Sequence, residues 1–513
     1  MTDLENGDGG GPEGQRVLLS NLAAVRAVTE AVAGTLGPRG LDCLLVAENG
    51  ETVLTNDGVT ILRHLDAPHP AARLLIQAAE AQERAVGDGT TTATILAGAL
   101  VTEGIEQILR GVPATRVVDG IRLGLVQAIS ALDRLRRPVS GLDDPALHAA
   151  VRNAARGDAG VAGAVLDAAR HLGGPRLDEA GFSLSERVLG LDGAADGAYP
   201  GVIIEREPAT PGGPSRLEGA VVLAIDGALE AEALPPEALS SAAGLTRAEA
   251  AKAAFGATLA RLAESGPGLV LAGRGVAEEA ARFLAERGII ALRRVAERDL
   301  RRAAALSGAR PIVRLPGSTM EGILGRVAMV EYDPAAGLVR LAGGPGPPEA
   351  TIVVGGATAE AVAERERIAR DAAAALQQAR RGGVVPGGGA AELALARALA
   401  GCNPGGMASY GVACLREAMR RPLAQLAANA GFNPLAKVEE AYAAQERMNS
   451  AGLGIDPETG EVADLAERGI LDPHSVKESA LRTAVEAATA ILRIGNILKM
   501  RSGSGEEGWH DPA

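Results

Sequence analysis

Aromatic residues and cysteines are scarce in this chain. Its 513 residues include only four Phe, four Tyr and one Trp, so the hydrophobic cores must be built mainly from Ala, Val, Leu and Ile. Any surface that binds other proteins must then be mainly aliphatic. Cys43, Cys402 and Cys414 are an odd number of cysteines spread over a long chain, which excludes a disulfide framework and predicts a reducing, cytoplasmic setting.

An excess of basic charge and long apolar runs are also missing. Lys and Arg number 51 against 64 Asp and Glu, and the net charge of -13 argues against a nucleic-acid partner. No apolar run approaches the roughly 18 to 20 residues that span a bilayer. The first residues are acidic and glycine-rich, without the basic and then apolar pattern of a secretion signal. We therefore expect neither nucleic acid nor a membrane as a partner.

The length of the chain predicts two to four domains. Short β-rich runs alternate with helical segments between about residues 187 and 345, which predicts an α/β domain there. Helical sequence resumes at residue 357 and dominates to Ile497, apart from a hairpin expected around "GIDPETGEV". Helix-rich ends around an α/β centre indicate that the two ends build one domain into which the centre is inserted.

Periodicity and turn signals place the individual elements. A hairpin with its turn at Asn49-Gly50 follows the first helix. The stretch "PPEALSSAAGLTRAEAAKAAFGATLARLAESG" is a helix-biased insertion between two strands and should protrude or pack on an edge. The helices expected in the first block span residues 15–36, 70–86, 90–110 and 114–136. The β-rich runs of the centre are "GVIIERE", "AVVLAID", "GLVLAG", "GIIALRRV" and "PIVRL".

The stretch "GDGTTTA" is the first candidate for chemistry. Gly87 and Gly89 let the backbone approach a ligand, and the N–H groups at the start of the next helix, Thr90 to Thr92, are suited to phosphate oxygens. Asp88 would then hold Mg²⁺, because a carboxylate alone would repel phosphate. The alternative is a Thr-capped helix after a glycine turn. Neither of the common phosphate fingerprints, GxxxxGK[ST] and GxGxxG, is present here, so both interpretations stay open.

Four other stretches have both a structural and a functional interpretation. "TLGPRG" at residues 35–40 is a helix C-cap with a proline turn, and "TNDGVT" at 55–60 is a tight turn in which Asp57 bonds its own backbone. "VVPGGG" brings three glycines to the start of a helix. In "GILDPHSVKESAL", Asp472 is placed as an N-cap with Pro473 in the first helical position. Each stretch is a weak signal by itself.

Two further features favour structure over function. Asp371 lies at the border of the thin apolar stripe of its helix, which is typical of a solvated charge. The run "GLVLAGRGVAEEAARFLAERGII" resembles a dinucleotide site at Gly273 and Gly275, but the third glycine of that fingerprint is missing. An ordinary βαβ unit is the favoured interpretation.

Taken together and in this order, "TLGPRG", "TNDGVTIL", "GDGTTTA", "VVPGGG" and "GILDP" resemble the chaperonin family of ATP-driven protein-folding rings. The similarity spans about residues 15 to 500. The centre of the chain looks like the archaeal and eukaryotic-cytosolic branch, the thermosome-like or group II chaperonins. Some stretches read partly like the bacterial type, so the chain is placed as a bacterial, group III member of the archaeal-like branch.

The resemblance implies a multidomain chaperonin fold. A mainly α-helical equatorial ATP-binding domain would span residues 1–137 and 386–513. A small α/β intermediate hinge domain would span residues 138–186 and 346–385. An α/β apical substrate-binding domain would span residues 187–345, with a helical protrusion at about 232–264 that serves as a built-in lid.

The resemblance also assigns site residues. Asp88 would hold Mg²⁺, and Asp57 and Asp371 would orient and activate the water that attacks ATP. Asn153 and Arg156 stay unassigned, because the Ser/Thr-rich pattern of relatives is lost around them. The implied cofactors are ATP and Mg²⁺, with K⁺ left open as a further ion. The residues implied to contact the nucleotide are Leu36, Gly37, Pro38, Gly58, Gly89, Thr90, Thr91, Thr92, Gly388 and Asp472, the last at the ribose or base end.

The implied function is an ATP-dependent molecular chaperone. It would enclose non-native polypeptides in stacked rings of about eight subunits and couple hydrolysis to closure of its own lid, with no separate co-chaperonin. The alternative is a chaperonin-like binding scaffold that has lost turnover. A lapsed ATPase should have lost one of Asp57, Asp88 or Asp371, and all three are present, which favours the active chaperone.

Overall fold

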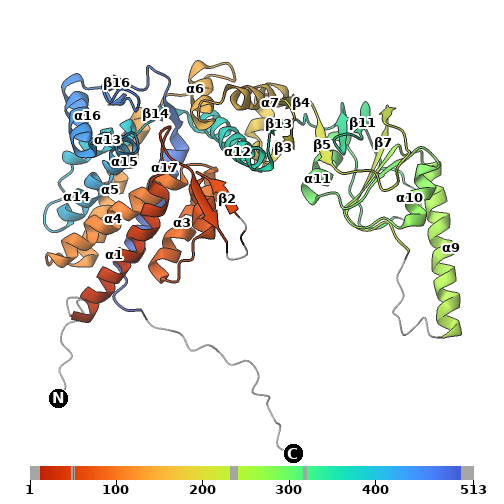
Figure 1. Ribbon diagram of the computed structural model, residues 1–513, viewed down its shortest axis with the longest axis horizontal. Helices are drawn as coiled ribbons and strands as arrows, with labels where there is room; N and C mark the ends of the chain where they lie inside the picture. Colours follow the sequence, from red (N-terminus) through yellow and green to blue (C-terminus); the bar gives the residue numbers. More distant parts are fainter. Residues whose placement is uncertain (1–11, 48–49, 51, 232–240, 316–319, 498–513) are drawn as a thin grey trace, which may run out of the picture. The chain divides into compact units, whose positions relative to one another are not determined.

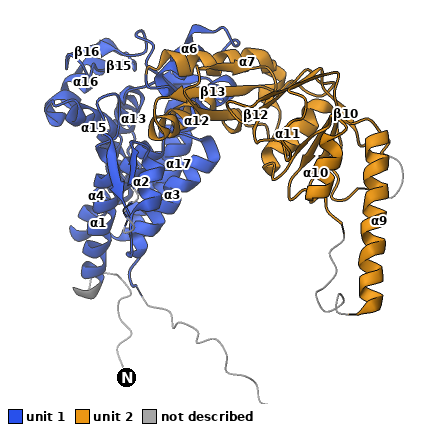
Figure 2. Cartoon of the chain, turned by 45° about the vertical axis from the view of Figure 1, so that its right-hand side comes forward, with its two compact units in different colours: residues 1–156, 374–513 blue, residues 157–373 orange. Residues whose placement is uncertain are grey.

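The computed structural model describes residues 12–47, 50, 52–231, 241–315 and 320–497. The chain divides into two compact units, which Figure 2 shows in different colours. Unit 1 comprises residues 1–156 and 374–513, and unit 2 comprises residues 157–373. The two ends of the chain therefore share one unit, and the centre forms the other. This division is coarser than the three predicted domains, whose boundaries stay predictions.

In its described residues, unit 1 is mainly helical, with three short antiparallel strand pairs (Figure 1). Its helices are α1 (Pro12–Ala33), α2 (Gly58–His64), α3 (Pro70–Val86), α4 (Thr90–Leu109), α5 (Ala114–Leu135), α6 (Pro145–Ala154), the end of α12 (Ala359–Gly382), α13 (Ala390–Ala400), α14 (Ala408–Ala418), α15 (Arg421–Asn429), α16 (Pro434–Met448) and α17 (His474–Leu492). Its strand pairs are β1 (Cys43–Val46) with β2 (Thr52–Thr55), β14 (Val384–Pro386) with β17 (Leu471–Pro473), and β15 (Leu453–Ile455) with β16 (Val462–Asp464).

Helix α4 lies at the centre of the unit 1 core. It packs against α1, α3, α14 and α17, and its side chains from Ala93 to Val101 are almost all buried. A helix that is apolar on every side belongs inside a protein. Small residues let its neighbours approach closely: a Cβ on Gly104 would lie 2.6 Å from Leu492 Cδ1 of α17. This packing fixes the position of the first residue of α4, Thr90.

The described part of unit 2 combines three sheets with helices. The sheets have the strand orders β10-β7-β8-β9, β5-β12-β11-β6 and β3-β13-β4. The described elements are α7 (Ala159–Asp178), the 3₁₀ turn η1 (Ser185–Arg187), β3 (Val188–Asp192), β4 (Gly197–Tyr199), β5 (Val202–Glu205), β6 (Arg216–Glu218), β7 (Val221–Ile225), α9 (Ala242–Glu264), β8 (Leu269–Ala272), α10 (Glu278–Ala285), β9 (Ile290–Leu292), α11 (Glu297–Ser307), β10 (Gly325–Arg326), β11 (Met329–Asp333), β12 (Leu338–Ala342), β13 (Thr351–Gly356) and most of α12.

A buried charge cluster joins distant segments of unit 2. The side chain of Glu349 is only 1% exposed, and its carboxylate accepts from Arg176 Nη2 at 2.7 Å and from Arg302 Nε at 3.2 Å. Arg187 Nη2 lies 3.5 Å from the same carboxylate. The ring of Phe182 lies under the guanidinium groups of Arg176 and Arg187. Each charge therefore has an opposite charge beside it, which is the condition under which buried ions are tolerated.

Most of the predicted elements are confirmed. The helices expected at 70–86, 90–110 and 114–136 are α3, α4 and α5, and the second predicted hairpin is β15 with β16. The run with Gly273 and Gly275 belongs to a βαβ unit in which β8 and β9 are parallel and α10 connects them. In the predicted insertion, Ala242–Glu264 is one helix, α9, and residues 232–240 lie outside the described part.

The segment "PIVRL" and the hairpin turn differ in how they compare with the sequence prediction. The segment "PIVRL", predicted as a β-rich run, does not form a strand. Its Ile312 makes only an isolated β-bridge to Ile225. In the hairpin of β1 and β2, the strands pair antiparallel as predicted, and Asn49 of its turn lies outside the described residues.

Within the described part of the chain, none of the helices combines the length and apolarity that a membrane span requires.

The helices α5 and α14 cross where Gly120 meets Gly411, and this crossing gives a test of the packing in unit 1. A Cβ on Gly120 would overlap the carbonyl oxygen of Ala408 and lie 2.8 Å from Gly411 Cα. Gly120→Ala should therefore destabilise unit 1 by about 1–3 kcal/mol, although alanine is the better helix former. Hydrogen exchange of the α5 and α14 amides measures this loss. Gly163→Ala is the control, because a Cβ there meets nothing within 4 Å in α7; equal effects of the two substitutions would contradict the packing argument.

Candidate functional site

The turn "GDG" connects α3 to α4 through two left-handed glycines. Gly87 ends α3 at φ 71°, and Gly89 precedes α4 at φ 78°. A side chain at either position would be strained and crowded, since a Cβ on Gly87 would lie 2.8 Å from Ala374 Cβ, and one on Gly89 would lie 2.8 Å from Val476 Cγ1. The turn is thus fitted between the end of α12 and the beginning of α17.

The first turn of α4 has no side-chain cap. The first intrahelical hydrogen bond runs from Ala93 N to Gly89 O at 2.9 Å, so the N–H groups of Thr90, Thr91 and Thr92 precede the helical ladder. Gly89 is the N-cap residue and offers no side chain to them. The structure therefore differs from the Thr-capped alternative. Three amides at the positive end of a 20-residue helix are suited to an anion.

Asp57 begins α2 beside this turn. Its carboxylate accepts from the backbone N–H groups of Val59 at 3.3 Å and Thr60 at 3.1 Å, so it is a true N-cap. A Cβ on Gly58 would overlap Thr91 Oγ1, which shows that the beginnings of α2 and α4 touch. Asp57 and the "GDGTTT" stretch therefore share one corner of unit 1.

Carboxylates are concentrated at this corner. Burial, with smaller effects of the charges of Asp57 and Asp88, raises the pKa of Glu83 to about 7. Burial and then the charge of Asp472 raise the pKa of Asp88 to about 6, against opposing effects of the Gly89 N–H and Lys477. The corner is thus rich in negative charge that is poorly compensated by the protein, and a cation would relieve it.

A buried glutamine holds the turn in place. The side chain of Gln82 is fully buried, and its Nε2 donates to the carbonyl oxygens of Asp88 at 2.9 Å and Val476 at 3.3 Å. Its Oε1 accepts from Ser479 Oγ at 2.7 Å. The "GDG" turn is therefore tied to the first turns of α17, a segment almost 400 residues away in sequence.

Two other predicted stretches lie against α15. Asn429 Nδ2 donates to the carbonyl oxygens of Ala33 and Leu36, both at 2.9 Å, and Gly37, at φ 84°, leaves room for Leu426. Pro38 continues this turn. Gly388 and Gly389 have φ values of 60° and 79°, and a Cβ on Gly389 would lie 3.0 Å from Leu423. Helix α15 therefore positions both the "TLGPRG" turn and the "VVPGGG" turn.

The predicted helix-capping role of Asp472 is wrong. Asp472 lies in β17, where it pairs with Val385 of β14, and α17 begins only at His474 with Pro473 as its N-cap residue. Backbone pairing with a distant strand keeps Asp472 extended, which a local sequence signal does not reveal. Its carboxylate instead accepts from Asn153 Nδ2 at 2.8 Å and lies 2.8 Å from Lys477 Nζ.

The structure adds residues to the site that the sequence analysis missed. Lys477 binds Glu392 as well as Asp472, and Glu83 joins the carboxylates near Asp57. Arg156, left unassigned above, has a left-handed backbone at φ 54° and donates from Nη1 to Asn56 Oδ1. Of these residues, Glu392 was the one that the sequence could have indicated, because it is a lone acid at the start of the otherwise apolar segment "AAELALA".

The predicted site residues fall into two groups. The structure brings those of unit 1 into the two neighbourhoods just described, around the beginning of α4 and along α15 and β17. Asp371 is on α12 in unit 2, three residues before Ala374, with which unit 1 resumes. Within the described residues, no group of three or more His, Cys, Asp or Glu side chains is arranged to hold a metal ion by itself.

Comparison with known proteins now gives the class. Residues 28–502 match the TCP-1/cpn60 chaperonin family. Thermosome subunit beta of Archaeoglobus fulgidus is 32% identical, over 97% of this chain and 95% of that protein. Thermosome subunit beta of Desulfurococcus mucosus is 31% identical, over 94% of this chain and 99% of that protein. The solved structure of a group III chaperonin in the open state is similar with a TM-score of 0.85 and 41% identity, over 95% of this chain and 99% of that one.

The chain therefore belongs to the TCP-1/cpn60 chaperonin family. Its likeness to thermosome subunits and to a group III chaperonin confirms the predicted family and branch. The predicted fold class, the multidomain chaperonin fold, is confirmed as well, and the relatives support a chaperone function.

The pKa of Glu83 gives a test of the carboxylate corner. Because this pKa is raised from 4.5 to about 7 in the folded chain, protonation of Glu83 favours folding below about pH 4.5, and this contribution is lost as the pH rises toward 7. Glu83→Gln should therefore exceed the wild type in stability at pH 8, by at most about 3 kcal/mol, and hardly at all at pH 4.5. Urea unfolding at both pH values, without nucleotide, measures the difference. The same gap at both pH values would contradict the raised pKa.

Proposed function

We propose that this chain is an ATP-dependent chaperonin subunit that encloses non-native polypeptides in a double ring and couples hydrolysis of Mg·ATP to closure of its own lid. The uncapped first turn of α4, with Asp88 and Asp57 beside it, is the observation that carries the proposal. It combines donors for phosphate oxygens with carboxylates for a divalent cation. Thermosome subunits and a group III chaperonin among its relatives support the same function.

The residues of unit 1 fit Mg·ATP. The amides of Thr90, Thr91 and Thr92 would bind phosphate oxygens, and Asp88 would contribute one ligand to Mg²⁺, whose other ligands come from phosphates and water. Mg²⁺ supplies charge neutralisation for phosphoryl transfer to water. The negative corner around Glu83 and Asp88 agrees with such a cation. Whether K⁺ also binds stays part of the proposal to be tested.

The remaining predicted contacts would surround the nucleotide and the attacking water. The "TLGPRG" and "VVPGGG" turns, with Leu36, Gly37, Pro38 and Gly388, would contact the nucleotide, together with Gly58 and Gly89. Asp472 would meet the ribose or base end. Asp57 and Asp371 would orient and activate the water. Since Asp371 belongs to unit 2, hydrolysis would depend on the arrangement of the units, and this dependence would couple the chemistry to lid closure.

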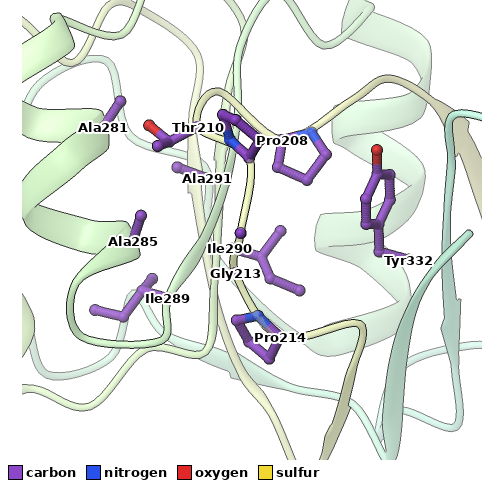
Figure 3. Close-up of a pocket in the computed structure, with 12 residues that line it drawn as sticks. Pro208, Thr210, Gly213, Pro214, Ala281, Ala285, Ile289, Ile290, Ala291 and Tyr332 are labelled. Carbon is purple, nitrogen blue, oxygen red and sulfur yellow. The ribbon is translucent and has the colours of Figure 1, made fainter. Parts of the chain in front are cut away.

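Unit 2 has a small pocket lined mainly by alanine, isoleucine, glycine and proline residues. Figure 3 shows Ala281, Ala285 and Ile289 facing a loop that contains Pro208 and Pro214. Such a surface has no aromatic anchors except Tyr332 at its edge. It would bind many apolar segments without strong preference, as a chaperone for varied non-native clients requires. Helix α9 of the same unit would form the built-in lid, so that no separate co-chaperonin is needed.

Apolar side chains exposed on the hairpin of β1 and β2 favour self-association. Leu44 and Val46 of β1 are 60% and 67% exposed, and Leu54 of β2 is 49% exposed. In the described residues the two strands pair only with each other, so each has an open edge. Exposed apolar strands with open edges are typical of interfaces. We therefore assign this hairpin to contacts within a ring of about eight subunits.

ATP hydrolysis tests the proposed water-activating pair. Asp57→Asn keeps the N-cap of α2, because asparagine caps helices as well as aspartate does, and removes the charge. Asp371→Asn removes the charge within α12. The double variant should bind Mg·ATP with an affinity within a few-fold of that of the wild type. Its rate of phosphate release should fall by about 10²-fold or more. Asp119→Asn, at an exposed position of α5, is the control and should keep wild-type turnover.

Two other outcomes of that assay are informative. Magnesium-dependent turnover that is equal in the wild type and the double variant would refute the assignment of Asp57 and Asp371. Binding of Mg·ATP without any turnover by the wild type would instead support the binding scaffold that has lost hydrolysis.

Assembly tests the hairpin. Leu44→Lys with Val46→Lys changes side chains that are already exposed, so the subunit should still fold, but lysines would have to be buried in the proposed interface. Analytical ultracentrifugation with Mg·ATP should show rings for the wild type and small species for this variant. Leu245→Lys, at a 55% exposed position of α9, is the control and should still form rings. Intact rings of the hairpin variant would exclude this interface.

A further inference from the structure

A buried lysine connects the predicted nucleoside end of the site to the start of α13. Lys477 Nζ lies 2.6 Å from Glu392 Oε1 and 2.8 Å from Asp472 Oδ2. The side chains of Lys477 and Glu392 are only 11% and 3% exposed. Although burial lowers the pKa of Lys477, the charges of Asp472 and Glu392 outweigh this effect and raise it, so Lys477 stays charged. The lysine joins α17, α13 and β17 at one point.

The contacts of Asp472 leave its carboxylate a single orientation. Oδ2 faces Lys477 Nζ, and Oδ1 accepts from Asn153 Nδ2 at 2.8 Å. The backbone of Asp472 is fixed by its pairing with Val385. A Cβ on Gly387 would lie 3.0 Å from Oδ1, so the glycine leaves the space that the carboxylate occupies. Backbone, both oxygens and the surrounding volume are all determined by neighbours.

A fixed carboxylate can still recognise hydroxyl groups. Each carboxylate oxygen has two lone pairs, so Oδ1 and Oδ2 retain acceptor capacity after their contacts with Asn153 and Lys477. Asp472 is also more exposed than its partner, with a side chain 23% accessible against 11% for Lys477. The side chain of Lys477 is thus less accessible to a ligand than that of Asp472, and the lysine contacts Asp472 through Oδ2.

We propose that Lys477 is a positioning residue for the nucleoside part of the substrate: together with Glu392 and Asn153 it holds the Asp472 carboxylate in the orientation that accepts hydrogen bonds from the ribose hydroxyls. This inference rests on the proposed nucleotide site. Glu392 holds the lysine, and the lysine holds Asp472. Lys477 would therefore act on the sugar end through Asp472. Because its charge also lowers the pKa of Asp88, the variants are compared well above the pKa of about 6 of that carboxyl, where Asp88 is ionised and binding of the triphosphate to the α4 turn should stay unchanged.

The test compares two probes on the full-length chain. Mg·ATP carries the sugar, whereas Mg·tripolyphosphate carries only the phosphates. Lys477→Met should weaken binding of Mg·ATP about tenfold and leave binding of Mg·tripolyphosphate within about twofold, as measured by calorimetry. Asn153→Ala removes the other bond to Asp472 together with the bond to the Leu471 carbonyl oxygen, and it should give a smaller loss of the same selectivity. Arg302→Met, which breaks the buried cluster around Glu349 in unit 2, is the matched control and should change neither affinity.

A second comparison asks whether Lys477 acts through Asp472. In an Asp472→Asn background, Lys477→Met should cause no further loss of Mg·ATP affinity, because the carboxylate that it orients is gone. Lys477→Met leaves Glu392 buried without a counter-ion, so the double variant Lys477→Met/Glu392→Gln serves where the single variant does not fold. It should show the same selective loss for Mg·ATP.

The outcomes separate this inference from the proposed function. Equal weakening of both probes, unchanged Mg·ATP affinity in the lysine variants, or a full effect in the Asp472→Asn background would overturn the positioning role. A wild-type chain that binds neither probe would instead overturn the proposed function. Selective loss of Mg·ATP binding in the lysine and asparagine variants supports the role.

Discussion

The amides at the beginning of α4 are the constraint on which the rest of unit 1 depends. Three backbone donors precede the first helical hydrogen bond there, and the N-cap residue is a glycine without a side chain. Because α4 is buried among α1, α3, α14 and α17, these donors cannot be moved to a solvated surface by a small shift of the helix. The core therefore fixes these three N–H groups in one place. In the proposed function, the glycines of "GDG" would let a ligand approach them closely.

At the same corner, amides without a side-chain cap lie beside carboxylates. Asp88 and Glu83 are partly buried and have raised pKa values, which means that the folded chain accommodates their charges poorly when no ligand is present. Phosphate alone would increase this repulsion, and a divalent cation alone would meet no preformed cluster of three or more ligands in the described residues. A cation bound together with phosphates satisfies both conditions, because each neutralises what the other cannot.

Local signals predicted much of this structure, and long-range pairing explains the rest. The helices α3, α4 and α5 follow from apolar periodicity and from glycine and proline at their ends. The turn "GDG" follows from two glycines, which tolerate the left-handed backbone that the structure has there. Asp472 looked like a helix cap because the local sequence before Pro473 is ideal for one. Its actual conformation depends on Val385 of β14, and the role of Lys477 depends on Glu392, 85 positions away. A local reading of the sequence does not contain such partners.

Helix α12 spans the division between the two units. It runs without interruption from Ala359 to Gly382, and the division between the units falls within it. In unit 2, Arg365 of this helix binds Asp158 at 2.9 Å and Asp196 at 2.6 Å; in unit 1, Ala374 lies against Gly87. A helix resists bending unless a proline or a similar break interrupts it, and α12 contains none. Arg365 in unit 2 and Ala374 in unit 1 therefore belong to one continuous helix, and Asp371 lies between them.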